Sequence, residues 1–476
     1  MISEKRIVRA VDDANVHFLW CWERFQKLKR FEIEPQDLTD FQVRLTAAFT
    51  ILDRTYRLIK ADQKRLIERK EQYSRPWFAS RMGKLDLYLK AVKEALGIGR
   101  SLGDGFAWIF YKDESALLEQ HNTEQRQLLL PPSVGGLGER AFIEKLQGLK
   151  GMFVLYHAIT SFLRLGDVSF FDPVSGEIVG IGELKTRHVE GDRYDITLGF
   201  VSGGFENPML KQDESEEPDV RFEPLDQSTR KKLNKQMDQL GNALEMRVKA
   251  DANPRIETSS KFHFEVLERN IQSCGARAFE MRKAGPGLIL GAWRPRLQSS
   301  LGKRIMRSAT NIDAAISPVE AAVAKILDPQ LEDNCLFIGN LGNHETGFPV
   351  TPSGGVPMIW WPLGEQQIHD LLFGHVLVIT LFNPAILWAI LRKRGFEVIL
   401  GRRSRVLKIT KKVGKAGLDL ENFSYFENLI PYALMDENAV ADMIDASVKQ
   451  IVAAAGGRPA KVGIRPHLRF EPDRRK

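Results

Sequence analysis

Two carboxylates and a lysine stand close together in the stretch from Leu165 to Thr186. Asp167 opens one apolar run, and Glu183 and Lys185 close the next run as an acid-x-lysine triplet. Carboxylate oxygens suit a hard divalent ion such as Mg²⁺, which keeps other positions for water and a phosphate oxygen. Such an ion stabilises negative charge on a phosphate and makes its bound water more acidic. A nearby lysine can orient that water. These residue types therefore predict metal-assisted hydrolysis of a phosphate ester.

A β-hairpin is expected to position these side chains, because the two apolar runs flank the turn-like Pro173–Gly176. Facing residues then have numbers that sum to about 349–350, so Asp167 faces residue 182 or 183 and its Cβ lies roughly 4.5–5.5 Å from that of its partner. Asp167 and Glu183 can therefore share one ion. Lys185 lies two residues further and points to the same face. The backbone carbonyl of Leu184 could supply a third ligand.

Asp172 fails the same test. It faces Glu177, about six residues along the strand from Glu183, or roughly 20 Å away at 3.3 Å per residue. We therefore expect Asp172 to be a turn residue.

At these residues the sequence resembles the PD-(D/E)XK nuclease superfamily, whose pattern is an acid, a variable gap, and an acid-x-lysine on the next strand. The resemblance covers about residues 135–250. It implies a restriction-endonuclease-like α/β core, a mixed sheet flanked by helices, that cuts phosphodiester bonds with Mg²⁺, or with Mn²⁺ as the alternative ion. It also implies a catalytic acid on the preceding helix and a polar residue on the following helix. The candidates for these two roles are Glu144 (or Glu139) and Gln236 (or Gln239).

The net charge of +7 is unevenly spread along the 476 residues. The segment 392–415 carries +9, because it holds ten basic residues and a single acid, so the rest of the chain sums to −2. Phosphate contact is the functional interpretation of such a segment, and a solvated surface is the alternative. The residues concerned are Arg392, Lys393, Arg394, Arg402, Arg403, Arg405, Lys408, Lys411, Lys412 and Lys415.

The chain is long enough for two to four domains, and its 43% hydrophobic and 27% charged residues are typical of globular proteins. That composition excludes a wholly disordered chain and a multi-span membrane protein. We expect a multi-domain α/β protein with a helical bundle or coiled coil in residues 1–130, the nuclease-like domain in 131–255 and a further α/β domain in 256–476. Apolar periodicity predicts helices at 3–28, 38–70 and 85–96, with Pro76 ending the second.

One apolar segment, Leu371–Leu391, has the length of a membrane span. A buried strand over Val376–Phe382 is the better interpretation, with Asn383 as the N-cap and Pro384 at the first position of a helix that ends before Gly395.

Other residues with chemical potential are expected to be structural. His157 lies between apolar runs, and Trp360-Trp361 is more typical of a core than of a base-stacking site. The glycines of 97–103 have the spacing GxGxxxG after a helix, which is not the spacing of a dinucleotide-binding loop.

The sequence therefore predicts a metal-dependent nuclease, with DNA favoured over RNA, in the cytoplasm. The three distant cysteines fit a reducing compartment, and the N-terminal stretch lacks the apolar core of a signal peptide. The N-terminal helices would mediate self-association or binding of a partner protein. A role as a bacterial anti-phage or restriction effector follows by analogy. Two alternatives stay open: a non-catalytic nucleic-acid-binding or scaffold protein on a degenerate nuclease fold, and a membrane-associated effector.

Overall fold

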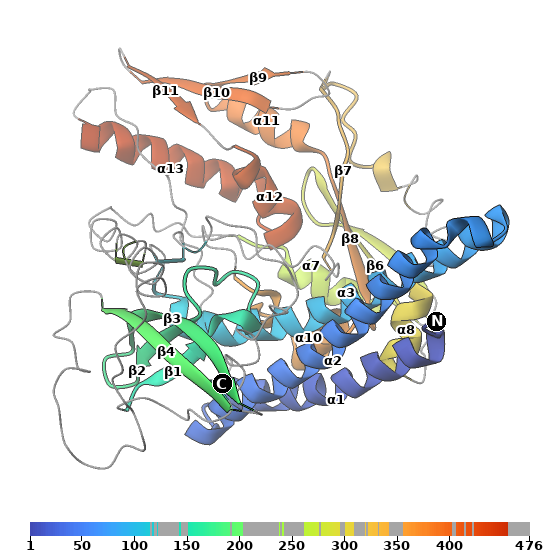
Figure 1. The fold of residues 1–476 in the computed structure, drawn as a ribbon. Helices are drawn as coiled ribbons and strands as arrows, with labels where there is room; N and C mark the ends of the chain where they lie inside the picture. Colours follow the sequence, from blue (N-terminus) through green and yellow to red (C-terminus); the bar gives the residue numbers. More distant parts are fainter. Residues whose placement is uncertain are drawn as a thin grey trace. The chain divides into compact units, whose positions relative to one another are not determined.

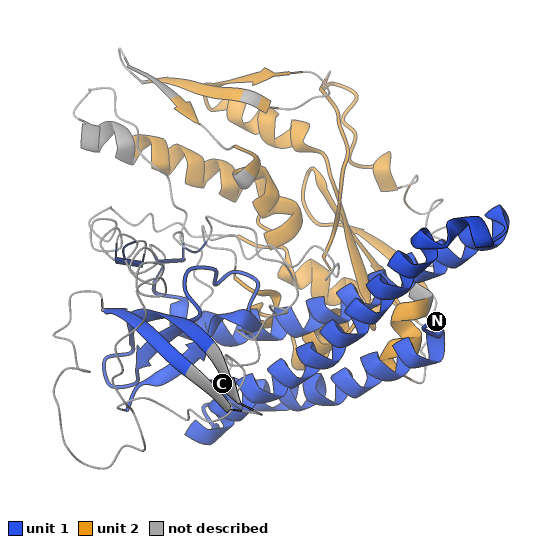
Figure 2. Cartoon of the chain, viewed as in Figure 1, with its two compact units in different colours: residues 1–254 blue, residues 255–476 orange. Residues whose placement is uncertain are grey.

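The protein combines helices with antiparallel sheets in a computed structural model. The structure describes residues 1–114, 117–118, 121, 142–143, 151–190, 193–202, 238, 240–241, 261–275, 278–295, 300–308, 319, 322–331, 333–341, 356–401, 406–413, 416–420 and 423–455. The chain divides into two compact units, residues 1–254 and 255–476, which Figure 2 draws in different colours.

Three long helices form much of the first unit: α1 (Glu4–Lys29), α2 (Pro35–Glu68) and α3 (Arg75–Tyr111). They pack against one another, as Figure 1 shows for the blue and cyan ribbons. A short 3-10 turn, η1 (Lys70–Gln72), separates α2 from α3. The expectation that Pro76 ends the second helix is wrong. Pro76 lies in the first turn of α3 instead. Proline has no N–H to donate, but the first N–H groups of a helix have no partner within the helix, so proline is tolerated there.

The third helix runs far beyond the predicted range of 85–96, straight through the glycines of 97–103. A Cβ on Gly99 would collide with the Phe18 and Phe49 rings, and one on Gly103 would collide with the carbonyl oxygen of Ile159. These glycines therefore let the helix approach its neighbours closely, and this contact offsets their poor helix propensity. Their spacing has a packing explanation rather than a nucleotide-binding one.

The first unit also contains a four-stranded sheet in the order β1-β2-β3-β4. Its strands and the 3-10 turn after β1 are β1 (Phe153–Tyr156), η3 (His157–Ile159), β2 (Val168–Asp172), β3 (Glu177–Glu190) and β4 (Arg193–Ser202). Every described pairing is antiparallel, whereas the expected core had a mixed sheet. Parallel pairing needs a crossover of a dozen or more residues, and the links from β2 to β3 and from β3 to β4 are too short for one.

The second unit contains a sheet in the order β5-β6-β8-β7 and a sheet in the order β11-β10-β9, both antiparallel in the described residues. Helix α12 packs on β7 and β8, and α11 packs against both α13 and β9 (Figure 1). The elements are α7 (Phe264–Ser273), β5 (Phe279–Lys283), β6 (Leu288–Trp293), α8 (Leu301–Ser308), β7 (Phe337–Asn340), η5 (Met358–Trp360), α10 (Glu365–Leu372), β8 (Leu377–Phe382), α11 (Pro384–Lys393), β9 (Phe396–Leu400), β10 (Val406–Val413), β11 (Ala416–Leu420), α12 (Ser424–Ala433) and α13 (Glu437–Ala455).

The long apolar segment folds as the sequence predicts. Its strand is β8, and the side chain of Asn383 accepts a hydrogen bond from the N–H of Ala385 to cap α11. Gly395 follows that helix with φ +82°, a left-handed conformation that favours glycine. Among the described residues, no helix is both long enough and apolar enough to cross a membrane.

Candidate active site

The hairpin that carries the candidate acids has the predicted register. Val168 faces Gly182 and Asp172 faces Glu177, with a one-residue irregularity between Phe170 and Phe171. The numbers of facing residues therefore sum to 350 on one side of the irregularity and to 349 on the other. Asp172 accepts hydrogen bonds from the next turn residues, and these bonds lower its pKa, so its predicted role as a turn residue is confirmed.

The backbone before Asp167 has an unusual shape. Gly166 has φ +71°, and a Cβ there would lie 2.6 Å from Ile181 Cγ2 and 2.8 Å from the carbonyl oxygen of Gly182. Proline, whose ring holds φ near about −65°, is excluded by this conformation. Glycine is therefore required here, because it tolerates both the positive φ and the close approach.

His157 contacts the backbone of Gly166 and Asp167. Its Nδ1 lies 3.0 Å from the carbonyl oxygen of Gly166, and its backbone N–H donates to the carbonyl of Asp167 at 2.9 Å. Its Nε2 lies 2.5 Å from Ser169 Oγ, which also contacts the Tyr111 hydroxyl. The His157 side chain is fully buried. Its predicted place in the core is confirmed, but its contacts to the backbone beside Asp167 were not predicted.

The carboxylate of Asp167 reaches across to the triplet on β3. Asp167 Oδ2 accepts a hydrogen bond from the N–H of Leu184 at 2.8 Å, which ties the acid to the middle of the acid-x-lysine motif. Glu183 and Lys185 form an ion pair, with Nζ 2.8 Å from Oε1. Their side chains are 13% and 31% exposed, so both are reachable from solvent. The structure thus bonds the Asp167 carboxylate to the backbone of the triplet, whose Glu183 and Lys185 side chains pair with each other.

Two further candidates cannot be placed beside these three. Glu144 and Gln236 lie outside the described residues, as do their substitutes Glu139 and Gln239. The described part of the candidate site therefore consists of two carboxylates, one lysine and the backbone of Leu184.

Four of the six basic residues that the structure describes in the segment 392–415 form ion pairs with acids. Ion pairs join Arg392 to Asp333, Arg394 to Asp442, Lys408 to Asp419 and Lys411 to Asp445. All four acids lie outside the 392–415 window, with Asp419 just beyond its end, so the local count of +9 overstates the free charge. Lys393 and Lys412 belong to the described part as well, whereas Arg402, Arg403, Arg405 and Lys415 lie outside it.

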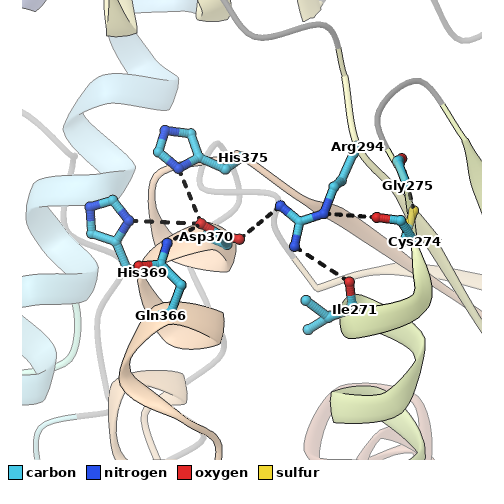
Figure 3. A network of polar contacts seen from close by, with 8 residues as sticks. All are labelled: Ile271, Cys274, Gly275, Arg294, Gln366, His369, Asp370 and His375. Carbon is cyan, nitrogen blue, oxygen red and sulfur yellow. Dashed lines mark hydrogen bonds and ion pairs between the residues drawn. The ribbon is translucent and has the colours of Figure 1, made fainter.

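A second polar cluster, which the sequence analysis missed, surrounds Asp370 on α10 (Figure 3). One carboxylate oxygen accepts from Arg294 Nη1 at 2.8 Å. The other accepts from Gln366 Nε2 at 2.7 Å and lies 3.3 Å from His375 Nδ1 and 3.9 Å from His369 Nδ1. Burial alone would raise the pKa of Asp370, but hydrogen bonds from its polar neighbours outweigh burial and lower that pKa.

This cluster has the ligand types of a metal site but serves another purpose. Arg294 also donates to the backbone carbonyls of Cys274 and Ile271, so it ties the end of α7 to α10 (Figure 3). Both oxygens of Asp370 already have protein partners, and the Arg294 charge would repel a cation. We therefore regard the cluster as a structural ion network.

Comparison with protein-family models, with curated proteins and with solved structures gives no match.

Proposed function

We propose that the chain is a metal-dependent nuclease that hydrolyses phosphodiester bonds, with DNA favoured as substrate. The observation that carries the proposal is the β2–β3 hairpin, whose register sets Asp167 opposite the Glu183-Leu184-Lys185 triplet. One Mg²⁺ held by the two carboxylates and the Leu184 carbonyl would polarise the phosphate and its bound water, and Mn²⁺ would serve as the alternative ion.

Each residue of the candidate site would have a separate role. Asp167 and Glu183 hold the ion, and Lys185 changes partner from Glu183 to the scissile phosphate or the attacking water. His157 and Gly166 keep the backbone of Asp167 in place. Glu144 and Gln236 belong to the proposal as the supporting acid and polar residue, and the basic segment 392–415 as the nucleic-acid contact.

The wider biological setting is part of the same proposal. The protein would act in the cytoplasm as a bacterial defence or restriction effector and would self-associate, or bind a partner protein, through α1–α3.

The direct ion pair between Glu183 and Lys185 favours one competing function. In a non-catalytic nucleic-acid-binding protein, Lys185 would neutralise Glu183 permanently and no ion would be needed. The two functions differ in whether Glu183 binds a metal ion and whether nucleic acid is cut.

The test is a cleavage assay on the full chain with plasmid DNA, single-stranded DNA and RNA, in Mg²⁺, in Mn²⁺ and in EDTA. We expect cleavage that needs the ion and falls at least about 100-fold in Glu183→Gln, which removes a charged ligand but keeps the shape of the side chain. Asp172→Asn is the matched control, because it changes an acid at the other end of the same hairpin and should cut as the wild type does. The proposal is wrong if the wild type cuts none of these substrates with either ion, or if Glu183→Gln cuts normally.

A further inference from the structure

Three potential metal ligands meet in the second unit, away from the hairpin in sequence. His263 directly precedes α7, Asp436 directly precedes α13, and Glu437 is the first residue of α13. A short antiparallel contact joins the two segments: Phe262 pairs with Met435, the N–H of His263 donates to the carbonyl of Leu434, and the N–H of Asp436 donates to that of Lys261. The backbone therefore holds these side chains together.

The ligand atoms of these three side chains lie too far apart to hydrogen-bond with one another, and the space between them could hold an ion. His263 Nε2 lies 3.9 Å from Asp436 Oδ2 and 3.8 Å from Glu437 Oε2, and the three ligand atoms all lie within 4.8 Å of one another. Ligand atoms that each lie about 2.0–2.1 Å from a tetrahedral zinc ion are roughly 3.3–3.4 Å from one another, so these two separations are wider by about half an ångström. An ion would therefore contact all three atoms once the side chains draw together by about that much or slightly more.

In each of the two carboxylates, one oxygen accepts hydrogen bonds from backbone N–H groups and the other faces His263. Asp436 Oδ1 accepts the N–H groups of Asn438 and Ala439 at the start of α13, so Oδ2 is left to face His263. Glu437 Oε1 accepts the N–H of Gly287 at 2.8 Å, and Oε2 faces His263. One oxygen of each acid is thus anchored by backbone, and the other points at the imidazole.

Burial makes this arrangement costly without a ligand. The side chain of Glu437 is fully buried and that of His263 is 10% exposed, yet Glu437 Oε2 and His263 Nε2 have no hydrogen-bond partner. Buried polar atoms in folded proteins are almost always satisfied by protein, water or an ion. The side chain of Asp436 is 20% exposed and opens the cluster toward solvent.

We infer that His263, Asp436 and Glu437 bind a divalent transition-metal ion, with one imidazole nitrogen and two carboxylate oxygens as ligands. This donor set suits zinc, and a fourth position stays open for water. The ion joins the segment before α7 to the start of α13 and so stabilises the second unit. The inference uses none of the hairpin residues and does not depend on the nuclease proposal.

The test is zinc binding by the full chain after removal of metals with a chelator. We expect equilibrium dialysis against Zn²⁺ to give one equivalent that is lost in both His263→Ala and Glu437→Gln. Glutamine keeps an oxygen for the N–H of Gly287, so the second variant preserves the anchoring bond. His375→Ala is the matched control in the other histidine–aspartate cluster and should keep this equivalent.

A second measurement covers the case in which a variant fails to fold. The metal-free wild type should gain thermal stability with Zn²⁺ and, with Co²⁺, show visible absorption bands of a four- or five-coordinate nitrogen–oxygen site. The inference is wrong if the wild type shows neither effect, or if folded His263→Ala and Glu437→Gln both retain the full zinc content. Loss of zinc in His375→Ala alone would place the ion in the Asp370 cluster and would also overturn it.

Discussion

Asp104 offers a quantitative test of how the first unit is held together. It lies in α3 with 2% of its surface exposed, and its two oxygens accept hydrogen bonds from the N–H and the hydroxyl of Ser161, each at 2.5 Å. Burial raises the pKa of Asp104 from 3.8 to about 6, although the Ser161 bonds and the charges of Arg100 and Arg164 act in the opposite direction.

The raised pKa determines the sign of the pH effect. The folded state holds the Asp104 proton more tightly than the unfolded state, so this contribution to stability is complete below pH 3.8 and is lost as the pH rises through about 6. A pKa difference of roughly two units corresponds to about 3 kcal/mol. Ionising Asp104 in the folded protein therefore costs about 3 kcal/mol of unfolding free energy at neutral pH.

The perturbation is Asp104→Asn. Its amide can accept from the Ser161 N–H and donate to the Ser161 hydroxyl, and it carries no charge at any pH. We expect the unfolding free energy of the variant, relative to the wild type, to rise by about 3 kcal/mol between pH 3 and pH 7. Urea unfolding of both proteins at a series of pH values measures this difference, and groups common to both cancel. A difference that does not change with pH would refute the reasoning.

Four further substitutions test the packing, the backbone at Gly166 and one ion pair. Gly103→Ala should destabilise the protein by about 1–3 kcal/mol, because the new Cβ would collide with backbone. Gly83→Ala in the same helix should stabilise the protein by about 0.5–1 kcal/mol, because open space surrounds the new Cβ. The urea midpoints of both variants measure these effects, and equal effects would contradict the packing argument. Gly166→Ala should cost about 1–3 kcal/mol because of the positive φ, and unchanged thermal stability would count against the described backbone. Burial acts to raise the pKa of Asp445, but hydrogen bonds from its lysine neighbours lower it, so its stabilising effect is present above pH 3.8 and is lost as the pH falls from 3.8 through the lowered pKa of the folded state. The destabilisation caused by Asp445→Asn should therefore be larger at pH 7 than at pH 3, and a pH-independent effect would argue against the ion pair with Lys411.

Features set by neighbouring residues could be predicted from the sequence. The register of the hairpin follows from a short turn between two apolar runs, so the positions of Asp167 and Glu183 relative to each other follow from counting. The start of α11 follows from Asn383 and Pro384, because a side-chain cap and a proline act within a few residues.

Features set by distant residues could not be predicted. Gly99 and Gly103 look like helix breakers until the rings and carbonyl that they contact are known. The segment 392–415 looks strongly basic because most of its acid partners lie elsewhere in the chain, such as Asp333 and Asp445. The grouping of His263 with Asp436 and Glu437 has no spacing signal, since only the fold brings the two segments together.

The most direct test of the central claim is the position of Mn²⁺ in crystals of the full chain, located by its anomalous scattering. The nuclease proposal predicts an ion bonded to the carboxylates of Asp167 and Glu183, with Lys185 released from its ion pair. A saturating concentration of Mn²⁺ that leaves the Glu183–Lys185 pair intact and places no ion at the hairpin would contradict it.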